Sequence, residues 1–196
     1  GIRLIHKQDN SPVAYCGIAV NTGTRDENEN EQGLAHFIEH MLFKGTAKRK
    51  AWHILNQLES VGGEINAYTT KEETFVYSTV LKEDFERAME LTSDIFFNST
   101  FPEKEIEKEI DIVLEEINSD KDNPSDLIFD DFEGLLFEGY PMGRNILGKA
   151  DLLEKYTPEN LKSFVAENYY TTEIVFFSLG NIDFSKIIRL AHKYLA

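Results

Sequence analysis

The sequence predicts an α+β fold in which several helices pack against a mostly antiparallel sheet. Three observations support this class. Short segments with strand composition alternate with longer helical patterns, the strand segments are spread along the whole chain, and no internal repeat, linker or low-complexity tract interrupts them. The 196 residues, 41% of them hydrophobic, suffice for one sizeable core, so residues 1–196 are expected to form a single domain.

The first half of the chain opens with two strands. Residues 2–7 form the first, and residues 12–21 are a nearly continuous apolar run, which is typical of a strand in the middle of a sheet. Residues 21–32 are polar and are expected to form a loop. Residues 33–43 follow as an amphipathic helix that ends at Gly45.

A second helix and two further strands follow. Residues 51–61 have a helical pattern that the Gly62–Gly63 pair closes. Residues 64–70 and 74–81 are predicted strands, and the latter is rich in β-branched and aromatic side chains.

Most of the second half is predicted to be helical. Residues 102–119 give the clearest helix, because a proline stands in the first turn and an apolar stripe runs along one face. The other segments predicted here are helices at 82–98, 124–137, 158–169 and 184–195, and a strand at 173–179. The aromatic residues Phe96, Phe97, Phe129, Phe132 and Phe137 have helical spacing, which indicates packing in the core or between domains.

Charge and cysteine content exclude several classes of function. With 35 acidic and 20 basic residues the formal net charge is −15, which argues against a nucleic-acid partner and against an anionic membrane surface. No apolar run reaches 18 residues, so no membrane span is expected. Cys16 is the only cysteine and cannot form an internal disulfide, which weakly favours an intracellular, cytoplasmic location.

The pentad from His36 to His40 is the strongest functional signal. On a helix, residues four apart are rotated by only roughly 40° and separated by about 6 Å, so both imidazoles can reach one ion. Glu39 lies beside His40 and points to the same space. This H-x-x-E-H order reverses the H-E-x-x-H zinc-protease motif and is the inverzincin form. The alternative is an ordinary amphipathic helix with two hydrogen-bonded histidines.

A catalytic zinc site usually takes three protein ligands, so a third must come from elsewhere in the chain. Glu109 and Glu116 lie on the predicted helix at 102–119, and their spacing of seven residues puts them on one face. The spacing does not decide between them. His6, His53 and His192 have no partner at ligand spacing and are interpreted as ordinary polar residues.

Several motifs together resemble peptidase family M16, which includes mitochondrial processing peptidase, pitrilysin and insulin-degrading enzyme. The resemblance is to the amino-terminal half of these proteins and covers nearly the whole chain. It is carried by the pentad with the following MLFKGT, by Gly62–Gly63 with the later NAYT, by Glu109 with Glu116, and by GRNILG at 143–148.

The resemblance implies a zinc metalloendopeptidase domain with one Zn²⁺. His36, His40 and Glu116 would be the metal ligands, and Glu109 would hold a ligand histidine in place. Glu39 would act as general base on zinc-activated water.

The resemblance also implies how peptides bind. Asn66 and Ala67 would lie on an edge strand that pairs with an extended peptide substrate. A second M16 domain, absent from this chain, would close over the site from the same polypeptide or from a partner subunit, so the isolated domain is expected to cleave peptides weakly. The alternative function is a non-catalytic, M16-like scaffold or peptide-binding subunit.

Overall fold

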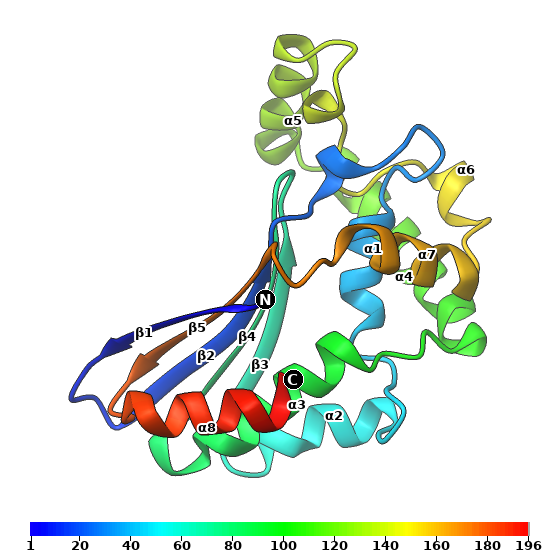
Figure 1. Cartoon of the computed structure of the whole chain (residues 1–196). Coiled ribbons are helices and arrows are strands. Elements are labelled where there is room, and N and C mark those ends of the chain that lie inside the picture. The colour runs from blue at the N-terminus through cyan, green and yellow to red at the C-terminus, as the bar shows by residue number, and fades with distance from the viewer. Residues whose placement is uncertain (196) are drawn as a thin grey trace.

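The computed structural model describes residues 1–195, apart from the side chain of Asp126, and has a five-stranded sheet with helices around it (Figure 1). The strands are β1 (Arg3–Gln8), β2 (Val13–Val20), β3 (Glu64–Thr69), β4 (Thr74–Leu81) and β5 (Ile174–Gly180). The helices are α1 (Leu34–Met41), α2 (Ala51–Glu59), α3 (Phe85–Phe97), α4 (Glu103–Lys121), α5 (Pro124–Leu136), α6 (Ala150–Leu153), α7 (Pro158–Asn168) and α8 (Phe184–Tyr194).

The strand order is β1-β5-β2-β4-β3, with β3 at one edge. Strand β2 lies in the middle and pairs antiparallel with β4 and β5, and only β1 runs parallel to its neighbour. The predicted α+β class with a mostly antiparallel sheet is therefore confirmed, and the apolar run at β2 occupies the central position expected for it.

One face of the sheet is covered by helices. Burial alternates along β4 and β5, so that every second side chain points into the core, as the two-residue period of a strand requires. Helix α3 packs against β2 and β4 and is flanked by α2 and α8, so these three helices form one layer (Figure 1). The buried apolar residues of this layer and of α1 form one hydrophobic core.

The structure differs from the predicted elements at a few places. The helix predicted at 82–98 begins with a separate turn of 3-10 helix, Lys82–Asp84, before α3 starts. The four-residue helix α6 was not predicted, because one turn is too short to show an apolar period. Cys16 is buried, and it is unpaired, as expected for a single cysteine. Among the described residues no helix is both long and apolar enough to cross a membrane.

Candidate metal centre

Helix α1 carries the H-x-x-E-H pentad and is anchored on its apolar side. Leu34, Phe37, Ile38 and Met41 are fully buried, so the opposite side of the helix presents the polar residues of the pentad. The carboxylate of Glu27 fixes the beginning of the helix. It accepts hydrogen bonds from the backbone N–H groups of Gly33 (3.0 Å) and Ala35 (2.9 Å), which lack partners within the helix.

A close approach between two glycines joins the start of α1 to the 145–148 loop. Gly33 and Gly148 both have positive φ, at 92° and 75°, a region that L side chains rarely adopt. A Cβ atom on Gly148 would collide with the backbone carbonyl of Gln32, and one on Gly33 would lie 2.6 Å from the Leu147 oxygen. The contact brings Ile146 and Leu147 to the wall of the pocket beside α1.

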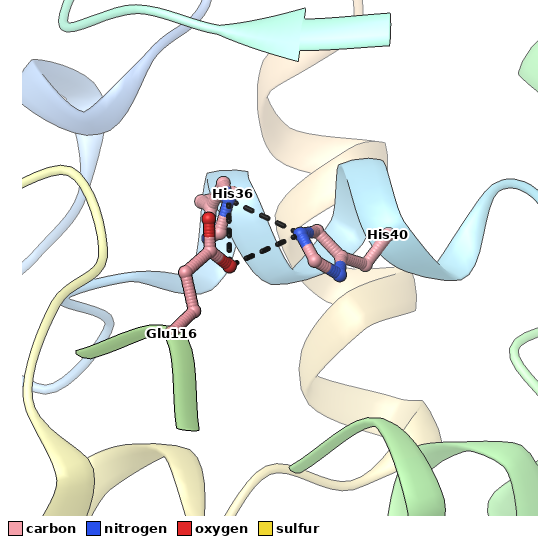
Figure 2. Close-up of side chains that lie close together, drawn as sticks. All are labelled: His36, His40 and Glu116. Atoms are coloured by element: carbon pink, nitrogen blue, oxygen red, sulfur yellow. Dashed lines mark hydrogen bonds and ion pairs between the residues drawn. The ribbon is translucent and has the colours of Figure 1, made fainter. Parts of the chain in front are cut away.

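Three side chains converge in this pocket. The Nε2 atoms of His36 and His40 lie 3.2 Å apart, and Oε2 of Glu116 lies 3.8 Å from the first and 3.6 Å from the second. Figure 2 shows the two rings on α1 and the Glu116 carboxylate on α4 pointing toward one another. One ligand atom from each of the three residues lies within 4.8 Å of the others.

The chemistry and spacing of these donors fit zinc. Two imidazole nitrogens and one carboxylate oxygen are a common ligand set for a catalytic zinc ion. Tetrahedral ligands at about 2.0–2.1 Å from zinc lie roughly 3.3 Å from one another, close to the separations observed. Burial, and to a lesser degree the neighbouring His40, lowers the pKa of His36 to about 3. His36 is therefore a neutral imidazole at pH 7, the form that binds metals.

Two residues behind His40 hold its ring in place. The Nδ1–H group of His40 donates to Oε1 of Glu109 (2.9 Å), and Nζ of Lys44 lies 2.6 Å from the other oxygen of that carboxylate. Burial alone would lower the pKa of His40, but the Glu109 hydrogen bond and the nearby carboxylates outweigh it and raise the pKa. The hydrogen bond with Glu109 also directs Nε2 of His40 toward His36 and Glu116.

Glu39 lies at the inner wall of the same pocket. Its side chain accepts a hydrogen bond from the Thr69 hydroxyl (2.7 Å), and the residue is only 9% exposed. Burial raises its pKa, which the Thr69 bond opposes. The pocket encloses about 520 Å³, and its lining includes Glu39, the three clustered residues, and Ala67 to Thr69 of β3.

The β3 edge borders this pocket. Within residues 1–195, β3 pairs only with β4, so its outer backbone edge is available to an added strand. Ala67 lines the pocket, whereas the side chain of Asn66 is exposed and is not part of the lining. Of the two residues predicted to contact the substrate, the structure therefore places Ala67 at the pocket wall and Asn66 on the β3 edge outside the lining.

Sequence comparison identifies the family of this fold and site. A sequence model of the insulinase family, peptidase family M16, matches residues 3–150. The chain belongs to peptidase family M16. This M16 chain is 39% identical over 180 residues to a protein of Rickettsia felis named as an uncharacterized zinc protease, covering 90% of the chain and 44% of the relative. It is 35% identical over 189 residues to the mitochondrial-processing peptidase subunit beta of Dictyostelium discoideum, covering 96% of the chain and 40% of the relative.

Solved structures share the fold of the M16 chain. A protease from Helicobacter pylori superposes with a TM-score of 0.93 at 21% identity, covering 99% of this chain and 47% of that one. A peptidase M16 inactive domain from Pseudomonas fluorescens superposes with a TM-score of 0.90 at 20% identity, covering 99% and 48%. The M16 chain spans less than half the length of the curated relatives that it matches.

Sequence reasoning missed the role of Lys44 at this M16 site. The sequence held only a weak signal, because Lys44 lies four residues after His40 but α1 ends at Met41, before it reaches Lys44. The hydrogen bond from Thr69 to Glu39 could not be found in this way, since it joins two elements whose relative position only the fold determines.

Proposed function

We propose that residues 1–196 form one metal-bearing domain of a zinc metalloendopeptidase that hydrolyses extended peptides. His36, His40 and Glu116 would hold a single Zn²⁺, with Glu109 fixing the ring of His40. The observation that carries the proposal is the convergence of three ligand atoms on one point at the wall of an open pocket. An amphipathic helix with two ordinary histidines would not require a distant carboxylate at that point.

Glu39 is assigned as the general base. When bound, zinc would supply Lewis acidity that acidifies water and polarises a carbonyl. The Glu39 carboxylate takes up the proton and later passes it to the departing amine nitrogen. Thr69 keeps Glu39 in position by donating to one of its oxygens, so the carboxylate is oriented before substrate arrives.

The substrate is assigned to the β3 edge. An extended peptide that adds to β3 would run along the pocket wall formed by Ala67, and the backbone of Asn66 and Ala67 would supply hydrogen bonds with little demand on sequence. Such binding needs a cover that excludes water, and we assign this role to a second M16 domain. The length of the relatives beyond the matched segment supports the assignment.

Metal content and peptide cleavage together test the proposal. We expect elemental analysis of the full-length protein to find one zinc per polypeptide, and cleavage of a fluorogenic peptide to stop when a chelator removes it. Glu39→Gln should keep the zinc and lose about 10²–10⁴-fold in kcat, the usual contribution of a general base. Glu115→Gln, at an exposed neighbour of Glu116, is the matched control and should retain both properties.

A non-catalytic M16 scaffold is the second candidate. It is favoured by one observation, the close fold similarity to a domain described as inactive. A scaffold has no need of zinc ligands, so absence of zinc from the full-length protein would support it. Full activity of Glu39→Gln would instead contradict the general-base assignment. The compartment stays a prediction that rests on the single cysteine.

A further inference from the structure

Helix α5 lies on the protein with its polar side inward. Glu133 forms an ion pair with Lys71 at the β3–β4 turn, and Asp130 accepts a hydrogen bond from Asn145 Nδ2 (2.8 Å). These contacts attach α5 to the rim of the metal pocket, since Asp130 and Asn145 also line it. In Figure 1, α5 projects from one end of the molecule, far from the layer of α2, α3 and α8.

The outward side of α5 is apolar. Its exposed residues lie within one helical stripe about 120° wide, given 100° per residue. Together with a tyrosine just beyond the helix they are between 61% and 77% exposed. These residues, here called the α5 apolar face, are Ile128, Phe129, Phe132, Leu135, Leu136 and Tyr140.

This face is unusual for the molecule. It holds six of the seventeen large apolar side chains that are exposed in the described part of the chain, on a segment of thirteen residues. A contiguous apolar patch of this kind marks an interaction site, because leaving it in water is unfavourable. Because Phe129 and Phe132 are exposed, packing in the core, one of the two alternatives predicted from the aromatic spacing, is wrong for them, and packing against another domain stays a prediction.

Charge narrows the class of partner. Residues 122–143 contain six aspartates and glutamates and no lysine or arginine. An anionic lipid surface would be repelled by this segment, since amphipathic helices that bind such surfaces carry basic residues beside the apolar face. A protein surface with an apolar centre and a basic rim is complementary to it.

We infer that the α5 apolar face is the docking surface for a second M16 domain of the same polypeptide. The inference rests on the proposed function and identifies the partner of its site. More than half of each curated relative lies outside the matched segment, so a single polypeptide can supply such a domain. Because α5 borders the metal pocket, a domain seated on this face lies beside the pocket mouth and covers the bound peptide.

Cysteine labelling of the full-length protein tests the docking surface. Cys16 is the only native cysteine in this chain and is fully buried, so labelling read by mass spectrometry on the peptide that carries an introduced cysteine reports on that surface position in both proteins. We expect Leu135→Cys to react at least about 10-fold more slowly in the full-length protein than in the 196-residue chain, because docking buries it. Leu55→Cys on α2, also an exposed leucine, is the matched control and should react equally in both. Unlabelled Cys16 shows that each protein is folded.

Two results would overturn the inference. Equal labelling of the Leu135→Cys variant in the full-length protein and in the 196-residue chain would show that nothing in the polypeptide covers the face. Protection that rises with protein concentration in the 196-residue chain would assign the face to a second copy instead.

A charge variant links the surface to activity. Leu135→Asp in the full-length protein should lower peptide cleavage about 10-fold or more with zinc content unchanged, since a buried interface does not accept an unpaired charge. Leu55→Asp should have no such effect, and equal cleavage by both variants would contradict the inference. The difference in maleimide labelling is measured without peptide cleavage. A failure of the docking proposal can therefore be distinguished from a failure of the peptidase proposal.

Discussion

The Nζ atom of Lys44 lies 2.6 Å from Oε2 of Glu109. The Glu109 side chain is only 5% exposed, so its carboxylate needs partners inside the protein, and Lys44 and His40 provide them. Burial alone would raise the pKa of Glu109, but the hydrogen bonds with His40 and Lys44 outweigh it and lower the pKa. Lys44 thereby acts on the proposed zinc site through Glu109, as a positioning residue that does not touch the cluster.

Replacing Lys44 should therefore weaken metal binding. We expect Lys44→Met to lower zinc affinity about 10-fold, the lower end of the effect of outer partners, because Glu109 loses one of the groups that orient it. Lys44→Arg should restore most of the affinity. Competition with a fluorescent chelator measures this without peptide cleavage. Lys108→Met removes an exposed lysine paired with Glu105 on α4 and serves as control. Unchanged affinity in Lys44→Met would show that Glu109 is held without Lys44.

The two glutamates of α4 should differ in the same titration. Glu109→Gln is expected to cost about 10–100-fold in zinc affinity, because only the support of His40 is impaired. Glu116→Gln should cost more, since it removes a charged ligand atom from the cluster. A larger loss in Glu109→Gln than in Glu116→Gln would reverse the roles assigned to these residues.

Spacing alone could not separate these two residues. Glu109 and Glu116 share a face of α4, so both could reach α1, and the position of Lys44 beside one of them follows only from how α1 and α4 cross. The pentad, by contrast, was predictable because both histidines and Glu39 lie within five consecutive residues of one helix, where local geometry fixes their relation.

The same distinction holds for the fold. β4 was predicted residue for residue, because alternation and β-branched composition end sharply at Thr74 and Leu81. The strand order was not predictable, since pairing depends on contacts far apart in sequence, such as β1 beside β5. The exposure of Phe129 and Phe132 could not be predicted from the sequence pattern either, because a helical period shows which residues share a face and not what covers that face.

Glu27 should make stability depend on pH. Burial raises the pKa of its carboxyl from 4.5 to about 8 in the folded protein, although the Gly33 and Ala35 N–H groups oppose this. The folded state thus binds the proton more tightly than the unfolded state. The stabilisation is fully present below pH 4.5 and is lost as the pH rises toward 8. We expect the free energy of unfolding to fall over that window.

Urea unfolding at several pH values measures this effect. Glu27→Gln cannot titrate, so the unfolding free energy of the wild type relative to the variant should fall as the pH rises from 5 to 8, by up to about 1.4 kcal/mol per pH unit. Glu59→Gln, at an exposed glutamate of α2, should follow the wild-type curve. A constant difference between wild type and Glu27→Gln across the window would mean that the folded protein does not raise this pKa.

Gly148 should tolerate no side chain. Gly148→Ala combines a strained positive φ with a collision between its Cβ and the Gln32 carbonyl, so we expect it to lower the free energy of unfolding by at least about 2 kcal/mol. Gly62→Ala is the matched control, because Gly62 has a similar φ of 72° and no atom within 4 Å of the added Cβ. Gly62→Ala should lower the free energy of unfolding only by the backbone strain, about 1–2 kcal/mol.

Because the Gly33–Gly148 contact also positions the pocket wall, Gly148→Ala should weaken zinc binding as well, while Gly62→Ala should not. Equal destabilisation and equal zinc affinity in the two variants would show that the close approach contributes nothing beyond backbone strain.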